Sequence, residues 1–190
     1  EDKFIFQTEY RQALKDDGFF ISDFSINHDG ENRSSHIFAN LNGKIDENTN
    51  YEIQAQDVTN DNYLKLYNLK ITSPIINDQS LLTSKITIDR EIEDDYDLNI
   101  STIVYENLSK EDSDKFQYIL PNFNYTKYVA IPESYKGNFK FISSGYQKNY
   151  DTNKYELIVN NDFLYESNNY ITNLGIANNF DILFKNINSY

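Results

Sequence analysis

The chain has 190 residues, with 30 acidic against 17 basic side chains and a formal net charge of −13 at pH 7. An acidic chain without a basic stripe is a poor candidate for binding nucleic acid, because phosphate contacts depend on Lys and Arg. Cysteine is absent, which excludes disulfides, cysteine–zinc sites and thiol catalysis. Aromatic residues, all Tyr or Phe, make up 15% of the chain, and this content disfavours disorder.

No apolar run approaches the roughly 18 residues that a membrane-spanning helix needs. A membrane β-barrel escapes this criterion because each of its strands is polar on one face. The chain has no methionine, even at position 1, so we expect a fragment, a processed product or an excised domain. No composition shift marks a linker, and residues 1–190 are expected to form a single unit.

Apolar and polar residues alternate with a period of two along most of the chain, the pattern of half-buried strands. The apolar positions include Phe4, Phe6 and Tyr10, then Phe20, Phe24 and Ile26, then Ile37, Ala39, Leu41 and Ile45, then Tyr51, Ile53 and Ala55, and later Tyr96, Leu98, Ile100 and Val104. The polar positions include Gln7, Glu9 and Arg11, then His36, Asn40 and Asn42, then Glu52, Gln54 and Gln56, and later Asp97, Asn99 and Ser101. Each run therefore predicts a strand with two distinct faces.

Clusters of Asn, Asp, Gly and Ser separate these runs and supply the conformations that tight turns need. They occur at residues 15–18, 27–34, 46–50, 59–62, 73–80, 90–95, 108–114, 132–138 and 149–153. A spacing of roughly 10 to 20 residues predicts about ten strands joined by hairpins. The predicted fold is all-β, an antiparallel up-and-down meander rather than a βαβ arrangement.

The segment QDVTNDNYLKLYNL, residues 56–69, places a dense apolar group directly after a polar turn. We expect Tyr63 and Tyr67 to act as interfacial or loop-packing anchors, with Leu64 and Leu66 packed against the rim of a β-barrel. The sequence leaves open whether lipid or a folded loop buries them.

Strand length and tyrosine placement favour a transmembrane barrel over a water-soluble sandwich. Two alternating runs extend over residues 114–129 and 153–167, whereas soluble strands usually have about 5 or 6 residues and tilted membrane strands about 9 to 11. Tyr recurs at predicted strand ends, where membrane barrels carry an interfacial girdle. These residues are Tyr10, Tyr51, Tyr96, Tyr128, Tyr150, Tyr155 and Tyr165.

Several motifs follow one another in a set order between residues 4 and 170. Glu9-Tyr10-Arg11 ends a strand before a turn that contains Gly18. Asp61-x-Tyr63-Leu64-x-x-Tyr67 follows a later strand, and Leu120-Pro121 introduces a run of alternating aromatic residues. In order and spacing, this succession resembles the β-barrel of the outer-membrane lipopolysaccharide-assembly family LptD.

The resemblance implies a place in the cell outer membrane and a part in delivering lipopolysaccharide to the outer leaflet. Such transport involves no covalent chemistry, so we expect neither enzyme activity nor a cofactor. A hydrated lumen would accept the glycan, while the acyl chains would pass to the bilayer between strands. The implied partners are lipopolysaccharide, outer-membrane lipid, a plug lipoprotein (LptE-like) and a periplasmic bridge protein (LptA-like).

This chain lacks the family's amino-terminal jelly-roll and its disulfide cysteines. We therefore expect a partial segment of a large transmembrane β-barrel. A generic porin-type outer-membrane barrel would share the alternation without the ordered motifs. A secreted β-sandwich, serving as an adhesin or a binding module, would share the alternation but would be soluble as a monomer without detergent.

Candidate sites for chemistry are few. His28 and His36 are the only histidines, and we expect solvated or lumen-facing side chains rather than a zinc pair. No Gly-x-Ser-x-Gly elbow accompanies the Ser, His and Asp residues, and SSGYQ at 143–147 lies within a predicted strand, so no catalytic triad is expected. The sequence therefore predicts no catalytic or metal-binding residue, and it does not identify the substrate-binding residues.

The acidic stretch DREIEDDYD, Asp89–Asp97, does not match the spacing of a calcium loop. We expect a solvated turn, with a second possibility that divalent ions held there bridge lipopolysaccharide phosphates. Asn-x-Ser/Thr sequons at Asn32, Asn99, Asn107 and Asn124 are expected by chance in so Asn-rich a chain.

Overall fold

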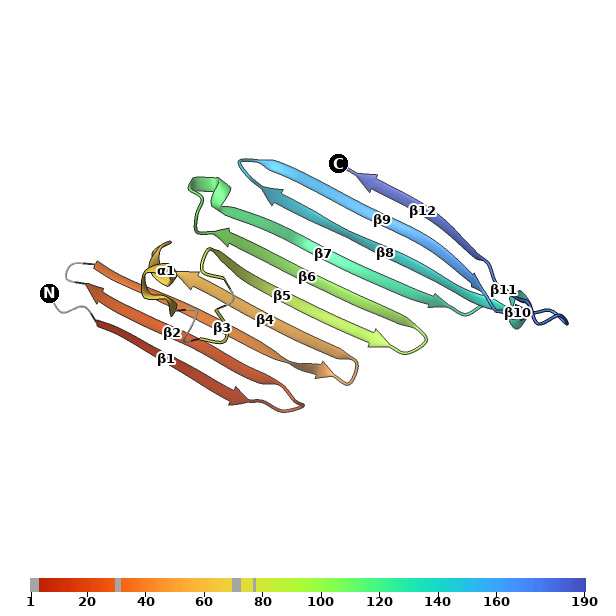
Figure 1. Ribbon diagram of the computed structural model, residues 1–190, viewed down its shortest axis with the longest axis horizontal. Coiled ribbons are helices and arrows are strands. Elements are labelled where there is room, and N and C mark those ends of the chain that lie inside the picture. The colour runs from red at the N-terminus through yellow and green to blue at the C-terminus, as the bar shows by residue number, and fades with distance from the viewer. Residues whose placement is uncertain (1–3, 30–31, 70–72, 77) are drawn as a thin grey trace.

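The computed structural model describes the chain apart from residues 1–3, 30–31, 70–72 and 77. Its main element is a ten-stranded antiparallel sheet in the order β1-β2-β3-β4-β5-β6-β7-β8-β9-β12 (Figure 1). These strands are β1 (Phe4–Ala13), β2 (Phe19–Asp29), β3 (Asn32–Asp46), β4 (Thr49–Val58), β5 (Leu81–Ile92), β6 (Tyr96–Asn107), β7 (Phe116–Val129), β8 (Gly137–Tyr150), β9 (Lys154–Ser167) and β12 (Asp181–Ser189). The predicted all-β meander is confirmed, and the sheet stays open instead of closing into a barrel.

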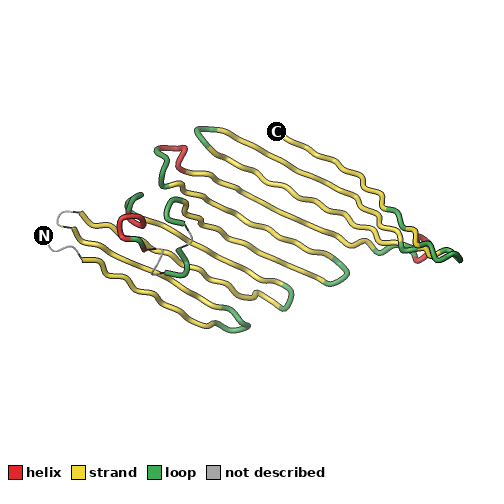
Figure 2. Tube along the Cα trace, in the orientation of Figure 1, coloured by secondary structure: helices red, strands yellow, loops and turns green. Residues whose placement is uncertain are grey.

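Short elements occupy the connections between strands. They are the helix α1 (Tyr63–Tyr67), the 3-10 turns η2 (Asp112–Lys115) and η3 (Glu133–Tyr135), and the small strands β10 (Tyr170–Ile171) and β11 (Ala177–Asn178). Strands β10 and β11 pair with each other beyond the end of β9. Figure 2 shows how little of the chain is helical and how the strands run side by side as one layer.

The strands are long, from 9 residues in β12 to 15 in β3. The predicted turn clusters mark the connections between strands, but those at 27–34, 46–50, 90–95, 132–138 and 149–153 also include residues of the flanking strands, and the one at 27–34 overlaps them most. Strand β2 extends to Asp29, β3 begins at Asn32, and the central residues 30–31 lie outside the described part of the chain. Asn27 pairs with Ser34, and His28 pairs with Arg33. Cross-strand pairing therefore overrides the turn preference of these polar residues.

Directly opposed residues of antiparallel strands share a face, so the register assigns every side chain to one side of the sheet. We call one side the apolar face; it carries Phe6, Phe24, Ile26, Ile37, Ile53, Ile86, Ile88, Ile100, Phe123, Phe141, Phe163 and Phe184. The other side is the polar face, with Gln7, Asp23, Ser25, His36, Asn40, Gln54, Lys85, Asn99, Asn124, Ser144, Asn160 and Lys185. The two faces predicted from the alternation are confirmed in each strand for which they were predicted.

A β-bulge in β7 keeps its aromatic residues on one face. The register shifts between Ile119 and Asn122 against β8, and a matching shift occurs against β6. Pro121 lies in this bulge, a position where a strand tolerates proline because no ladder hydrogen bond is lost. Phe116 and Tyr118 precede the bulge and Phe123 follows it, and the extra residue places all three on the apolar face.

A compact core lies where the connection from β4 to β5 folds back over β2, β3 and β4. Its buried members are Phe38, Val58, Tyr63, Leu64, Leu69, Ile76, Leu82 and Leu108. A folded loop therefore buries Tyr63 and Leu64, which answers the question left open by the sequence. The placement of Leu66 against the rim was wrong, because Leu66 is 73% exposed. Two residues correspond to about 200° around a helix, so Leu66 points away from the side on which Leu64 is buried.

Candidate functional site

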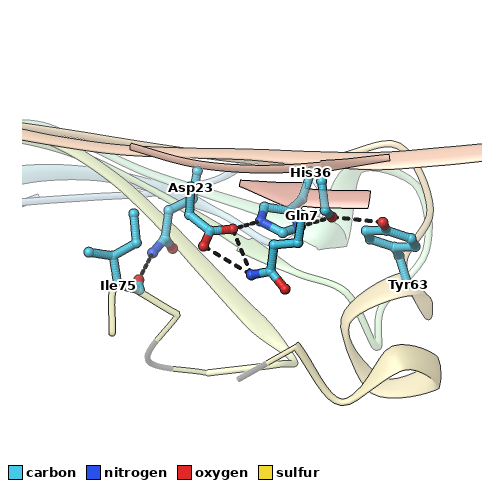
Figure 3. Close-up of polar contacts among 7 residues, drawn as sticks. Gln7, Asp23, His36, Tyr63 and Ile75 are labelled. Atoms are coloured by element: carbon cyan, nitrogen blue, oxygen red, sulfur yellow. Dashed lines mark hydrogen bonds and ion pairs between the residues drawn. The ribbon is translucent and has the colours of Figure 1, made fainter. Parts of the chain in front are cut away.

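A buried polar network joins the sheet to the connection between β4 and β5 (Figure 3). Ser25 Oγ of β2 lies 2.6 Å from His36 Nδ1 of β3 and 2.7 Å from the Tyr63 hydroxyl of α1. His36 Nε2 bonds to Asp23 Oδ1, and Gln7 Nε2 of β1 donates to both carboxylate oxygens of Asp23 at 3.1 and 3.0 Å. Ser25 and His36 are directly opposed across the ladder, and Asp23 lies two residues from Ser25, so the period-two geometry places all three on the polar face.

These residues include the Ser, His and Asp of a hydrolytic triad, but their arrangement does not present a nucleophile. Ser25 has no exposed surface, and Asp23, His36 and Tyr63 are each 1% exposed. The Ser25 hydroxyl is hydrogen-bonded to both His36 and Tyr63, and the segment that bears Tyr63 covers it. In this conformation the network fastens the covering segment to the sheet. The sequence did not predict that Asp23, Ser25 and His36 meet, although the period-two alternation places each of them on the polar side of its strand.

We call residues 59–69 and 73–76 the covering segment. Besides Tyr63, its contacts with the sheet include a hydrogen bond from Asn27 Nδ2 to the Tyr67 hydroxyl and one of 3.3 Å from Gln56 Nε2 to the Ile75 carbonyl. Figure 3 shows Tyr63 and Ile75 reaching the polar face from this segment. The covering segment therefore shields part of the polar face from solvent.

A second anchor ties the start of the covering segment to the neighbouring connection. Lys115 Nζ lies 2.8 Å from Asp61 Oδ1 and 2.7 Å from Glu106 Oε1. The hydrogen bonds from Lys115 to Asp61 and Glu106 raise the pKa of its ammonium group above the ordinary value. Burial, in turn, raises the pKa of the Tyr63 hydroxyl, which therefore stays protonated. At neutral pH the Tyr63 hydroxyl is therefore neutral and the Lys115 ammonium group is charged.

The two histidines lie on opposite faces of the sheet and cannot share a metal ion. His28 is opposed to Phe4 and Arg33 on the apolar face, with its ring centroid 6.0 Å from that of Phe4. His36 lies on the polar face, where the covering segment buries it, so the first of the two expectations for it, a solvated side chain, was wrong. Within the described ranges, no group of three or more His, Asp or Glu residues is placed to hold a metal ion.

The acidic stretch Asp89–Asp97 runs from the end of β5 into β6. Asp89 accepts a hydrogen bond from Asn99, Asp95 pairs with Lys127, and Asp97 accepts one of 2.9 Å from the Tyr128 hydroxyl. Each of these carboxylates has its own protein neighbour instead of converging on a common point. Elsewhere, SSGYQ lies within β8, and Asn99, Asn107 and Asn124 lie in β6 and β7.

The apolar face extends over all ten strands of the sheet. Its side chains remain open to solvent, including Phe6 at 55%, Ile37 at 55% and Phe184 at 64% exposure. No second layer covers this face in the described part of the chain. Contiguous apolar surface of this extent marks a contact with a partner or a membrane, because single scattered apolar residues are the norm on soluble surfaces.

None of the described helices has the length and apolar composition needed to cross a bilayer.

Comparisons of the chain with protein-family models, with curated proteins and with solved structures found no match. The resemblance to the LptD family therefore remains a prediction from the motifs.

Proposed function

We propose that this sheet is part of the wall of an outer-membrane β-barrel that delivers lipopolysaccharide to the outer leaflet, as the resemblance to the LptD family implies. One observation carries the proposal: a ten-stranded meander leaves an apolar face uncovered while its opposite face is polar. A lipid-facing wall with a hydrated lumen has this distribution, because lipid-facing and lumen-facing residues alternate along each strand.

Strand length and edge geometry also support a membrane wall. All ten strands of the sheet have at least nine residues, and a tilted membrane strand needs about 9 to 11. Backbone groups in the hydrocarbon region must be paired, so the open edges at β1 and β12 would need further strands to complete a barrel. The covering segment lies on the polar face and would narrow the lumen beside β2, β3 and β4.

The cargo and the partners of this proposal come from the resemblance. The polar face, with its amides, hydroxyls and paired charges, would accept the hydrophilic glycan of lipopolysaccharide. The bilayer lipid would contact the apolar face. A plug lipoprotein (LptE-like) and a periplasmic bridge protein (LptA-like) would act on other parts of the assembly, and the site of action would be the cell outer membrane.

Ile53 and Gln54 of β4 provide a matched test, because they are adjacent and lie on opposite faces. The chain has no tryptophan, so Ile53→Trp and Gln54→Trp each introduce a single fluorescent reporter. After refolding into phosphatidylcholine vesicles with brominated acyl chains, we expect strong quenching of the indole fluorescence in Ile53→Trp and weak quenching in Gln54→Trp. Equal quenching in both variants would exclude the lipid-facing assignment of the apolar face.

A second experiment tests whether the polar face contacts lipopolysaccharide. A photo-cross-linking residue at Asn124 on the polar face is expected to form adducts with lipopolysaccharide in the complete assembly, whereas one at Phe123 is expected to label phospholipid. Lipid labelling at Phe123 without lipopolysaccharide labelling at Asn124 would favour a generic porin-type barrel. A monomeric sample that melts cooperatively without detergent would favour the secreted β-sandwich and contradict the membrane proposal.

A further inference from the structure

The turn from β8 to β9 lies beside η2 and the start of β7 at one end of the sheet (Figure 1). Side chains of this region line an open cleft of about 350 Å³. It is lined by Phe116, Tyr118, Asn149, Tyr150, Asp151, Thr152, Asn153 and Lys154. This volume is at the lower end of the range of sites for small ligands, which typically combine apolar walls with a few fixed polar groups.

An aromatic pair forms the apolar part of this cleft. The rings of Phe116 and Tyr118 are nearly parallel, with an interplanar angle of 22° and centroids 6.1 Å apart. Both residues lie on the apolar face because of the bulge at Pro121. Tyr118 is 39% exposed, so part of this flat surface remains free to contact a ligand.

The polar part of the cleft is held in place by contacts with Lys110 and Asp114 and by an ion pair within the turn. Asp114 accepts hydrogen bonds from the Thr152 backbone at 2.6 Å and its hydroxyl at 2.7 Å. Asp151 binds Lys110 at 3.2 Å and Lys154 at 3.3 Å. The turn between β8 and β9 is therefore pre-organised, which lowers the entropic cost of binding a ligand there.

The side-chain amides of Asn149 and Asn153 make no hydrogen bond with another residue of the described chain. Each amide offers both donors and an acceptor. The two charged groups of the lining, Asp151 and Lys154, pair with each other, so the cleft has little net charge to attract a phosphate or a metal ion. The polar groups that remain free are neutral and suited to hydroxyl groups.

From this combination we propose that the cleft binds the pyranose ring of a saccharide. The apolar C–H face of the ring would lie on the Phe116–Tyr118 pair, and the ring hydroxyls would exchange hydrogen bonds with Asn149 and Asn153. The proposal goes beyond the membrane function, because it holds whether or not the apolar face contacts lipid. The same ring chemistry occurs in free sugars and in glycolipid headgroups.

Saturation-transfer NMR with methyl β-D-glucopyranoside and the full chain in deuterated micelles tests the proposal. We expect transfer to the sugar ring protons and an apparent affinity reduced about fivefold or more by Tyr118→Ala, the effect of losing an aromatic contact. Asn153→Gly removes the second contact with little strain, because Asn153 has a left-handed backbone with φ of 60° that glycine adopts freely. We expect a similar loss in that variant.

The control variant is Tyr10→Ala. Tyr10 and Phe20 form an aromatic pair with the same 6.1 Å separation, and neither residue lines the cleft. This variant should bind the glucoside as the unaltered chain does. Absence of transfer, or equal loss in all three variants, would overturn the proposal and leave the tryptophan quenching result unaffected.

A second probe, a glucosyl diacylglycerol in bicelles, identifies the source of the sugar. Tighter binding of the lipid-linked sugar than of the free glucoside, lost again in Asn153→Gly, would assign the cleft to a glycolipid headgroup. Equal affinity for both probes would assign it to a soluble glycan.

Discussion

Single residues explain why polar groups can be buried on an otherwise open sheet. Ser25 and His36 would be solvated on the polar face if the covering segment were absent. Once Tyr63 covers them, each needs a hydrogen-bond partner, because a buried unpaired polar group is strongly unfavourable. The chain from Asp23 through His36 and Ser25 to Tyr63 satisfies all four groups.

The position of Ser25 in the middle of this chain predicts unequal effects of two substitutions. Tyr63→Phe removes one terminal hydroxyl and should lower the free energy of unfolding by about 1 kcal/mol. Ser25→Ala leaves both His36 Nδ1 and the Tyr63 hydroxyl without their partner and should lower it by about 2 kcal/mol or more. Urea unfolding in micelles measures both values, with exposed Leu66→Ala as a nearly neutral control. Equal effects of the two substitutions would contradict a linked network.

The sequence predicted the face of the sheet on which each residue lies, but it did not predict which residues another segment covers. Period-two alternation is sufficient to place Asp23, Ser25 and His36 on one side of the sheet. Their burial depends on Tyr63, which lies 38 residues beyond Ser25 in the sequence and meets it only through tertiary packing. Local patterns contain no information on such a contact, so the sequence predicted a solvated or lumen-facing side chain for His36 and not a covered one.

At the scale of elements, strands and most turns followed from alternation and turn chemistry. The five-residue helix α1 did not, because one turn of helix is too short to show a period. The bulge in β7 also escaped prediction, although Pro121 marked the place. Its effect is large, since it determines the face on which Phe116 and Tyr118 lie and thereby forms one wall of the cleft.

The connection containing η2 and the β8–β9 turn predicts a local response to acid. The side-chain and backbone hydrogen bonds from Thr152 hold the pKa of Asp114 below the ordinary 3.8, and those from Lys110 and Lys154 do the same for Asp151. Carboxylates with lowered pKa values stabilise the fold above their ordinary pKa and lose this effect as the pH falls through their folded values. We expect the Thr152 amide resonance to shift in that acidic window. Asp114→Asn should remove the part of the shift that comes from the Thr152–Asp114 hydrogen bonds and leave only the part from the adjacent Asp151, whereas an unchanged curve would show that Asp114 is not a cause.

At the scale of the whole molecule, the sheet has two open edges and one uncovered apolar face. Both features favour association, and they do so in different ways. Detergent covers the apolar face but leaves the backbone groups of an edge strand free to pair. An edge at each side allows open-ended growth, because every added copy presents a new edge.

The hydrogen bonds between β9 and β12 show which groups face outward on the β12 edge. Leu157 and Tyr190 exchange both backbone hydrogen bonds, so by alternation the Ile187 N–H points away from β9. Ile187→Pro should therefore block pairing at this edge without breaking a hydrogen bond within the sheet. Size-exclusion chromatography in micelles, with the mass of each peak measured by light scattering, should show a ladder of oligomers for the unaltered chain. Ile187→Pro should stop at a dimer joined through β1, while Ile187→Ala, which keeps the N–H, should retain the ladder. Identical ladders in both variants would contradict growth through the β12 edge.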